Sequence, residues 1–482
     1  MQIQFATQTY RHQFPSVSGQ RLVNMFAEVE PQGSKSQVAV LSCPGMVLWQ
    51  NVGAGPIRGM HILNGVLYVV SGVFLYSVTT SKVVTQVGGQ ISGAAPVSMA
   101  DNGTQLCIVN GVNGYIYTTI SGFQLISSVS FFPANTVTFF DNFFVFNRAG
   151  TNQMFVSNVL DGTSYNALAF ASATVQPTQI VSILNQQENL FVFTQKDIET
   201  WYDGGLFPFP FARYDGATIE RGCAATQTTV KEDNSVFFLG DDIIFYRLNG
   251  IIPIRISTHA IESVWQAYNM VSDAFVFTYT WQGHKFVVLT FPSAPATWVY
   301  DIATNLWHER ESWRFGNINL QRWRGNGYIK FNDLDLIGDA YNGNIFQLTG
   351  TTFTESGNMM RGLMVAPTIH SDRKRVFHTC LELDMEAGVG LDTDIEIAST
   401  TTGNPLFGGL NPQVRLDWSN DRGHTFTSLR PWQSLGKIGD YSQRLRWLRL
   451  GQSRQRDYRV TITDPVPRTI IGANAYFNVG QQ

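Results

Sequence analysis

Phe143-Phe-Val-Phe146 is one of seven short apolar runs that decide the fold class. The others are Leu67-Tyr-Val-Val70, Leu106-Cys-Ile-Val109, Leu190-Phe-Val-Phe193, Val236-Phe-Phe-Leu239, Phe286-Val-Val-Leu289 and the weaker Leu336-Ile-Gly-Asp339. In chain order, the starts of the seven runs are 39, 37, 47, 46, 50 and 50 residues apart. Continuous apolar runs bounded by turn residues are typical of strands that are buried on both faces.

Each run is followed by a segment that carries an aromatic residue 9 to 14 residues after the start of the run. These aromatic residues are Tyr76, Tyr117, Phe155, Tyr202, Tyr246, Tyr300 and Phe346. Three or four short strands in a unit of roughly 40–50 residues are typical of a β-propeller blade. The sequence therefore predicts an all-β chain with a seven-bladed β-propeller at residues 51–350, in which the apolar runs are the inner strands.

Two other architectures fit parts of this pattern. A long β-sandwich also has frequent turn signals, but it lacks the pairing of a buried run with an aromatic follower at this longer period. A right-handed β-helix needs shorter repeats with Asn or Gly ladders, and the sequence has none. Helical periodicity is confined to residues 258–267, where we expect one or two helical turns.

The last predicted blade has no clear outer strand after Asn344-Ile-Phe-Gln-Leu348. Closing the ring removes exposed strand edges, and a strand from the other terminus often does this. Ser36-Gln-Val-Ala-Val-Leu41 alternates ahead of Pro44-Gly45, so we expect residues 38–41 to pair in this blade. Thr351-Thr-Phe-Thr354 is the local competitor.

The chain divides into three parts. Residues 1–50, with Pro15 and Pro31, are expected to form an extended N-terminal arm that wraps the propeller and supplies the possible closing strand. After a joint near residues 350–357, polar and apolar residues alternate at residues 379–386, 394–398, 414–418 and 458–462. Such alternation indicates strands with one wet face. Residues 351–482 are therefore predicted to be a C-terminal all-β domain resembling a β-sandwich.

Composition excludes several classes of protein. Of 482 residues, 44% are hydrophobic, which rules out disorder, and the net charge of −3 does not indicate a nucleic-acid binder. The four cysteines lie far apart, so we expect reduced buried thiols rather than a zinc site or disulfides. The N-terminus has no signal-peptide pattern, and the most apolar stretch, residues 66–78, is too short to cross a membrane. We expect a soluble protein made in a cytoplasm.

No catalytic or nucleotide-binding motif is present, and we predict no catalytic residue, cofactor or metal site. The segment from Ser419 to Phe426 fits the Asp-box pattern S-x-D-x-G-x-T-aromatic of sialidases. In those enzymes the box stabilises the fold away from the active site. We expect a structural turn in which Asp421 bonds backbone amides, Gly423 supplies a permissive φ and Phe426 packs inward.

The segment from Arg430 to Arg459 is basic, with eight Arg or Lys residues against two Asp. It is either a solvated strand face or a docking face, and Arg interleaved with Trp is typical of protein interfaces. The residues predicted to form a subunit interface are Arg444, Arg446, Trp447, Arg449, Arg454 and Arg456. Glu382, Asp384 and Glu386 are the expected carboxylate partners if the contact lies within a ring of subunits.

Two segments resemble the signatures of a known family. Arg21-Leu-Val-Asn-Met-Phe-Ala-Glu28, followed by Lys35-Ser36 and Pro44-Gly45, is similar to the opening of the packaged DNA stabilization proteins of short-tailed bacteriophages. The second signature of that family resembles Gly436-Lys-Ile-Gly-Asp-Tyr-Ser-Gln-Arg444, Trp447, Arg449-Leu-Gly451 and Arg456-Asp-Tyr-Arg459. The resemblance covers both ends of the chain and an intervening β-propeller.

The resemblance implies a structural tail hub, or nozzle. Six copies would form a ring that continues the DNA channel of the portal and adaptor and retains the packaged DNA. The implied partners are the other copies of a homo-hexamer, the adaptor ring of the portal vertex, a tail needle or tip protein, tailspikes or fibres, and double-stranded DNA that passes without sequence recognition. The protein would lie in the virion tail after assembly in the host cytoplasm, without membrane insertion.

The competing class is a propeller glycosidase or a glycan-binding adhesin. It would place convergent carboxylates and aromatic side chains at the mouth of the central channel, because glycoside hydrolysis uses a pair of carboxylates. A slightly acidic chain without catalytic motifs favours the structural hub, because the channel of a hub must not bind the DNA that passes through it.

Overall fold

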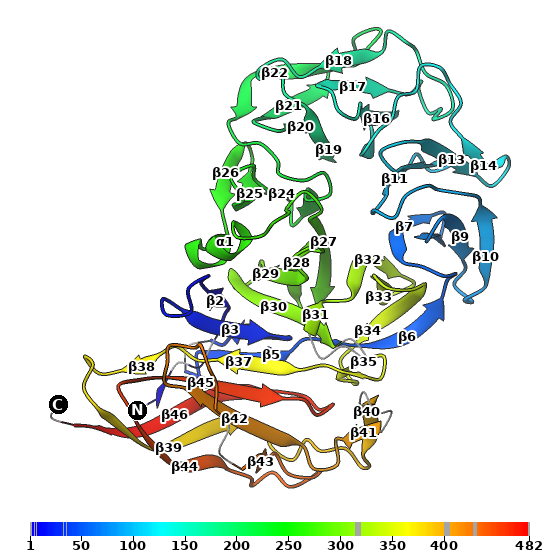
Figure 1. Ribbon diagram of the computed structural model, residues 1–482. Coiled ribbons are helices and arrows are strands. Elements are labelled where there is room, and N and C mark those ends of the chain that lie inside the picture. Colours follow the sequence, from blue (N-terminus) through cyan, green and yellow to red (C-terminus); the bar gives the residue numbers. More distant parts are fainter. Residues whose placement is uncertain are drawn as a thin grey trace.

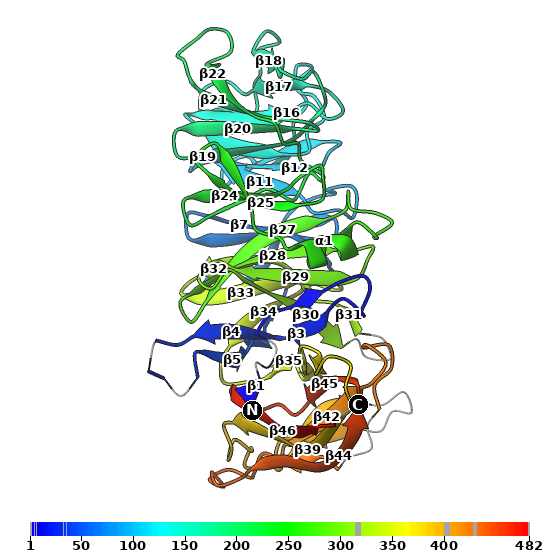
Figure 2. The same ribbon diagram turned by 90° about the vertical axis from the view of Figure 1, so that its left-hand side faces the viewer.

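The computed structural model describes residues 2–3, 5, 7–31, 33–34, 36–313, 320–399, 405–427 and 431–480. Small antiparallel sheets form a ring, and two larger packed sheets lie below it (Figure 1). The view in Figure 2, turned by 90°, keeps the packed sheets below the ring. The molecule is therefore a β-propeller joined to a β-sandwich.

Seven four-stranded units follow one another along the described chain. Their first and last strands are β7 (Ile57–Leu63) and β10 (Val84–Gly88), β11 (Ser98–Asp101) and β14 (Gly122–Leu125), β15 (Val137–Phe140) and β18 (Phe170–Ser172), β19 (Ile180–Gln186) and β22 (Phe211–Ile219), β23 (Val230–Glu232) and β26 (Ile252–Arg255), β27 (Phe275–Trp281) and β30 (Leu306–Trp313), and β32 (Gly325–Phe331) and β6 (Gly45–Asn51). The short strand β31 (Leu320–Arg322) pairs with β30.

The apolar runs form the second strand of each unit, so the prediction that they are the inner strands was wrong. These strands are β8 (Val66–Ser71), β12 (Leu106–Val109), β16 (Phe143–Asn147), β20 (Asn189–Thr194), β24 (Ser235–Leu239), β28 (His284–Phe291) and β33 (Leu334–Asp339). Each second strand has a strand on either side and neighbouring blades over both faces, which explains its continuous apolar sequence. In five of the blades the first strand, or a residue next to it, instead lines the channel cavity with polar side chains.

The predicted aromatic followers all lie in the third strands. These strands are β9 (Phe74–Val78), β13 (Gly114–Thr118), β17 (Gln153–Val156), β21 (Ile198–Asp203), β25 (Phe245–Asn249), β29 (Ala296–Asp301) and β34 (Asn344–Thr349). The predicted helical turns are confirmed as α1 (His259–Trp265), which Thr258 caps by accepting a hydrogen bond from the amide of Ile261. All four cysteines are free and buried, as expected.

Side chains of the first strands join neighbouring blades around the channel. His61 lies 2.6 Å from Asp101 of the next blade, and Thr138 donates to Asn185 at 2.7 Å. The hydroxyl of Ser182 is 2.8 Å from that of Thr229. These polar groups are therefore used to hold the ring together.

The closing strand is β6, and the prediction that residues 38–41 close the ring was wrong. β6 pairs antiparallel with β34. Thr354, the last residue of the local competitor, and Glu355 form β35 (Thr354–Glu355) on the outer side of β6. Residues 38–41 belong instead to β5 (Val38–Ser42), whose Val40 lies in the sandwich core. An alternating strand fits either sheet, so the pattern alone does not choose between them.

The sandwich has two sheets. One has the order β4 (Met25–Val29), β5, β46 (Ile470–Val479), β39 (Val376–Met385), β44 (Leu445–Ser453), with β1 (Gln2–Ile3) on β46. The other continues from β30 of the propeller through β3 (Gly19–Val23), β37 (Gly362–Val365), β45 (Gln455–Ile462), β42 (Gln413–Ser419) and β43 (Gln433–Ser434), with β2 (Tyr10–Arg11) on β3 and β38 (Ile369–His370) on β45. The short pairs are β35 with β36 (Asn358–Met359) and β40 (Ile395–Ser399) with β41 (Pro405–Gly408).

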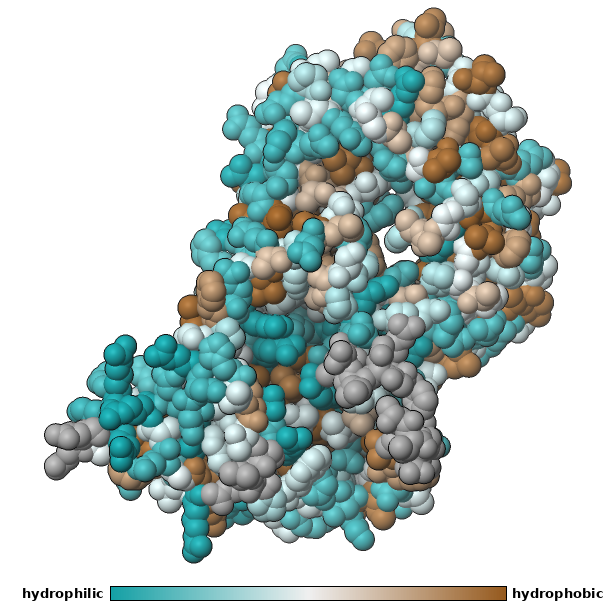
Figure 3. Space-filling model, in the orientation of Figure 1, coloured by the Kyte–Doolittle hydropathy of each residue, from teal (hydrophilic) through white to brown (hydrophobic). Residues whose placement is uncertain are grey.

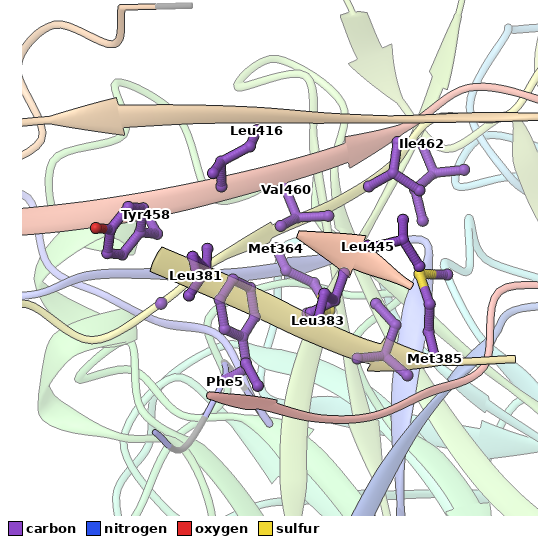
Figure 4. Packing of buried hydrophobic residues seen from close by; sticks show 14 of the residues in the cluster. Phe5, Met364, Leu381, Leu383, Met385, Leu416, Leu445, Tyr458, Val460 and Ile462 are labelled. Atoms are coloured by element: carbon purple, nitrogen blue, oxygen red, sulfur yellow. The ribbon is translucent and has the colours of Figure 1, made fainter. Parts of the chain in front are cut away.

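Apolar side chains fill the space between the two sandwich sheets. Leu381 and Leu383 of β39 pack with Leu416 of β42 and Val460 of β45 (Figure 4). Phe5 of the N-terminal arm enters the same core. Before β6 the arm therefore builds the sandwich and the joint, so the prediction that it wraps the propeller was wrong. Its last residues, in β6, supply the closing strand that was expected from the arm.

Candidate functional site at the joint between propeller and sandwich

The first signature segment lies where the two domains meet. β3 is inserted between β30 of the propeller and β37 of the sandwich, pairing through Val23 with Glu309 and through Arg21 with Val365. One sheet thus runs from blade six into the sandwich. A rigid connection follows, because backbone hydrogen bonds cross from one domain to the other.

Arg21 and Asn24 fasten β3 to β30. The guanidinium of Arg21 binds both carboxylate oxygens of Glu309, at 2.9 and 2.6 Å. Asn24 is fully buried with a φ of 54°, and its side-chain amide donates to the carbonyls of Glu311 and Arg361. Asn adopts this left-handed conformation more readily than most residues. The Arg and Asn of the signature therefore act as joint residues.

Glu28, the last residue of the segment, binds the propeller through a histidine. His284 of β28 is 2.8 Å from Asp301 and 2.6 Å from Glu28, and only the Glu28 carboxylate is well exposed. The hydrogen bond to Asp301 and the contact with Glu28 together raise the pKa of His284 to about 9, although burial acts against them. At neutral pH the imidazole is therefore a cation between two carboxylates.

Because the pKa of His284 is raised on folding, its contribution to stability is complete below about pH 6.5 and is lost as the pH rises through about 9. We expect the melting temperature of the wild-type protein to fall between pH 7 and pH 10. His284→Gln should lower the melting temperature at pH 7 and show a smaller fall over this interval. Calorimetry of both proteins across the interval measures the difference, and parallel curves would contradict the assignment.

The Pro44-Gly45 pair marks a close approach of two backbones. A Cβ atom on Gly45 would lie 1.9 Å from the carbonyl oxygen of Thr352, so only glycine fits beside this segment. The carbonyl of Pro44 accepts a hydrogen bond from the buried guanidinium of Arg310. Lys35 of the same signature lies outside the described residues.

The second signature builds the sandwich, which corrects part of the predicted interface. Trp447 is 2% exposed, lies in the core and donates its indole hydrogen to the carbonyl of Pro431. Arg456, equally buried, donates to the carbonyl of Leu450 and to Asn420, and stacks over Trp418. Both side chains face inward because they stand at the alternate positions that carry core residues, Trp447 with Leu445 in β44 and Arg456 with Tyr458 in β45. Neither is available to a partner.

The other predicted interface residues, Arg444, Arg446, Arg449 and Arg454, are exposed. Arg444 binds Glu382 of the neighbouring strand β39 at 2.6 Å, and Arg446 lies 3.8 Å from the same carboxylate. Glu382 thus has partners within its own chain, and its contact with another copy stays a prediction. Arg454 donates to the carbonyl of Arg373, and Arg430 lies outside the described residues.

The Asp-box segment is a turn. Asp421 accepts hydrogen bonds from the hydroxyl of Ser419 and from the amide of Thr425, and these bonds hold the pKa of its carboxyl well below the usual range. Gly423 has a φ of 80°. Phe426 packs against Val23, Leu363 and Val365 of the joint, and the Arg459 guanidinium lies 4.1 Å from its ring.

The propeller channel holds few acidic groups. A cavity of about 360 Å³ is lined by the first strands of five blades, and Asp101 is the one carboxylate among its described lining residues. A second cavity shares Thr226 and Gln227 with the first and contains Asp273. Figure 3 shows an opening near the centre of the ring. Neither cavity gathers the pair of carboxylates that glycoside hydrolysis uses.

Within the described residues, no group of three His, Cys, Asp or Glu side chains could hold a metal ion. The described part of the chain contains no helix long and apolar enough to span a bilayer.

Comparison with protein families decides the relationship. Residues 1–353 match the family model described as "Bacteriophage P22 Gp10, beta-propeller", and residues 362–478 match "Bacteriophage P22 Gp10, beta-sandwich". The chain belongs to the bacteriophage P22 Gp10 family. This is a family of structural tail-hub proteins of phages, and the resemblance seen at the two signatures is confirmed.

No curated protein matches this Gp10-family chain. Among solved structures, it is similar to the N-terminal domain of Nup159, with 10% identity, a TM-score of 0.39 and coverage of 67% of this chain and 98% of that one. It is also similar to the extracellular domain of the putative one-component system BT4673 from B. thetaiotaomicron, with 10% identity, a TM-score of 0.42 and coverage of 83% and 48%. A streptogramin B lyase matches with 8% identity, a TM-score of 0.39 and coverage of 63% and 97%.

Several joint residues of this Gp10-family chain were missed at the level of sequence. Glu309, Arg310 and Glu311 stand in the segment between Trp307 and Trp313, for which no sequence motif predicted a role. Three consecutive charged residues flanked by tryptophans in a strand indicate buried ion pairs, because large aromatic residues mark a covered strand. That signal would have pointed to the joint.

Proposed function

We propose that this chain is the tail hub, or nozzle, subunit of a short-tailed phage. Six copies form a ring that continues the channel of the portal and adaptor, retains the packaged DNA and anchors the tail needle and the tailspikes or fibres. Assembly takes place in the host cytoplasm and the ring remains in the virion tail. The observation that carries this proposal is the match of both domains to one phage structural family.

The joint supports the proposal. A hub must transmit force between the parts of a tail without separating its own domains, and here one sheet, the Arg21–Glu309 ion pair and the His284 contacts cross from propeller to sandwich. The net charge of −3 suits a channel through which DNA must move, since a strongly basic lining would bind its phosphates.

A glycosidase or adhesin has no specific observation in its favour. The Asp box serves as a turn at the joint, and each channel cavity has a single carboxylate among its described lining residues. We therefore propose a non-enzymatic role, in which no residue of the chain is catalytic.

Mass measurement of the protein mixed with its portal–adaptor complex tests the proposal. We expect six copies per vertex, visible as a sixfold ring by electron cryomicroscopy. A chain that stays monomeric beside assembled portal and adaptor would contradict the hub role. Cleavage of host glycans by the purified protein would contradict the non-enzymatic role.

A further inference from the structure

The β-sandwich carries opposite charges at its two ends. At the end where β38 turns into β39, the exposed side chains of Arg373, Lys374 and Arg375 follow one another. Arg454 joins them, since its guanidinium donates to the carbonyl of Arg373. We call these four residues the basic end. Figure 1 shows it beside β38, at the left of the sandwich.

The other end of β39 leads into a group of carboxylates. Glu386 follows the strand, and Asp392, Asp394 and Glu396 precede or begin β40; all four are exposed. We call them the acidic end, which lies toward β40 and β41 at the right of Figure 1. The ten residues of β39 separate the two ends by about 30 Å, at roughly 3.3 Å per residue.

No ion pair with another described residue neutralises the charges at either end, although the Asp394 carboxylate accepts a hydrogen bond from the amide of Leu410. No ion pair joins Arg373, Lys374, Arg375, Glu386 or Glu396 to a described residue. This differs from Arg444, which is neutralised by Glu382 of β39. Like charges gathered on one surface repel each other, so an arrangement of this kind costs stability unless a partner of opposite charge binds.

Each end also presents apolar side chains to solvent. Phe377 and Val479 lie beside the basic end with exposed fractions of 44% and 45%. Phe407 of β41, which pairs with Glu396, is 60% exposed at the acidic end. An apolar centre with a charged rim is the composition of protein interfaces rather than of surfaces that bind nucleic acid.

We infer that the basic end of one copy binds the acidic end of the next copy, so that the sandwich domains associate head to tail. The inference rests on the proposed function, because it assigns the contact within the proposed ring. Two different surfaces that join identical chains generate a closed ring when the rotation between copies closes. The complementary partner surface is present on the same chain, whereas a DNA partner would leave the acidic end unused.

Charge reversal tests the contact. We expect Arg373→Glu/Lys374→Glu/Arg375→Glu to abolish ring assembly on the portal–adaptor complex, and Glu386→Lys/Asp392→Lys/Glu396→Lys to abolish it as well. An equimolar mixture of the two variants should assemble again, because in an alternating ring with an even number of subunits every contact then joins opposite charges. Circular dichroism and melting temperature confirm that each variant is folded.

A matched control keeps the test specific. Glu188→Lys/Asp215→Lys/Glu220→Lys makes the same change of net charge as the acidic-end variant, but on exposed residues of the propeller, and should assemble like the wild type. Assembly by either reversed variant alone, or failure of the mixture, would overturn the inference while leaving the hub role standing. Loss of DNA retention in normally assembled rings of the basic-end variant would assign that end to DNA and overturn it too. A wild-type chain that never forms a ring would overturn both proposals.

Discussion

A chain that lacks residues 1–51 is expected to lose the cooperative unfolding transition of both domains. The deletion removes β6, the outer strand of the last blade, and with it the pairing that closes the ring. It also removes β3 from one sandwich sheet and β4 and β5 from the other. Both domains are then left with unpaired strand edges and with a hydrophobic core that is uncovered on one side. Thermal unfolding followed by circular dichroism measures the effect.

Two single substitutions test the contribution of β6 to the last blade while the rest of the arm stays in place. Trp49 is 5% exposed and packs edge-on against Phe331, so Trp49→Ala should destabilise the protein by about 3–5 kcal/mol. Its neighbour Leu48 is 53% exposed, and Leu48→Ala should cost less than about 1 kcal/mol. A truncated chain that melts as the full chain does would show that the propeller closes without β6.

The repeat of the propeller could be predicted from the sequence because each blade places the same kind of strand in the same environment. A second strand covered on both faces has to be apolar along its whole length, and the aromatic third strand follows at a nearly constant distance. The same reasoning placed the apolar runs innermost in the blades, whereas they are the second strands. Hydroxyl groups at the first strands bind the next blade: Thr138 of β15 donates to Asn185, and Thr136, just before β15, accepts from the amide of Ile183. This polar pattern is not specific to a strand.

The path of the arm could not be predicted, because it depends on contacts between residues that are far apart in the sequence. β5 and β6 both alternate, and only the hydrogen bonds to β46 and β34 assign them to different domains. The signatures were found at the correct positions, but their roles came from structure. Arg456 and Arg444 look alike in a sequence, yet one is buried against Trp418 and the other lies on the surface.

Glu309→Ala is expected to destabilise the protein by about 3 kcal/mol, the lower end of the range for breaking a buried ion pair. The Glu309 side chain is 9% exposed, whereas Arg21 keeps 24% of its surface in water, which reduces the cost of leaving its charge unpaired. Thr9 also donates to this carboxylate, so the substitution frees two parts of the arm. Chemical denaturation at pH 7 measures the loss.

The same carboxylate predicts a dependence on pH. Burial alone would raise its pKa, but the guanidinium of Arg21 holds the pKa of Glu309 below the ordinary value of 4.5. The contribution of the pair is therefore complete above about pH 4.5 and is lost as the pH falls through the lowered pKa. Wild-type stability should decline in this acid range, and Glu309→Gln should be less stable at pH 7 and decline less.

A surface ion pair provides the control for both measurements. Asp233 binds Arg247 at 3.0 Å with 42% of its side chain exposed, so Asp233→Asn should cost less than about 1 kcal/mol and leave the acid dependence unchanged. If Glu309→Ala is as mild as this control, the Arg21 ion pair does not hold the joint. The joint would then depend on the backbone pairing of β3 with β30 and β37 and on the side-chain amide of Asn24, which donates to the carbonyls of Glu311 and Arg361.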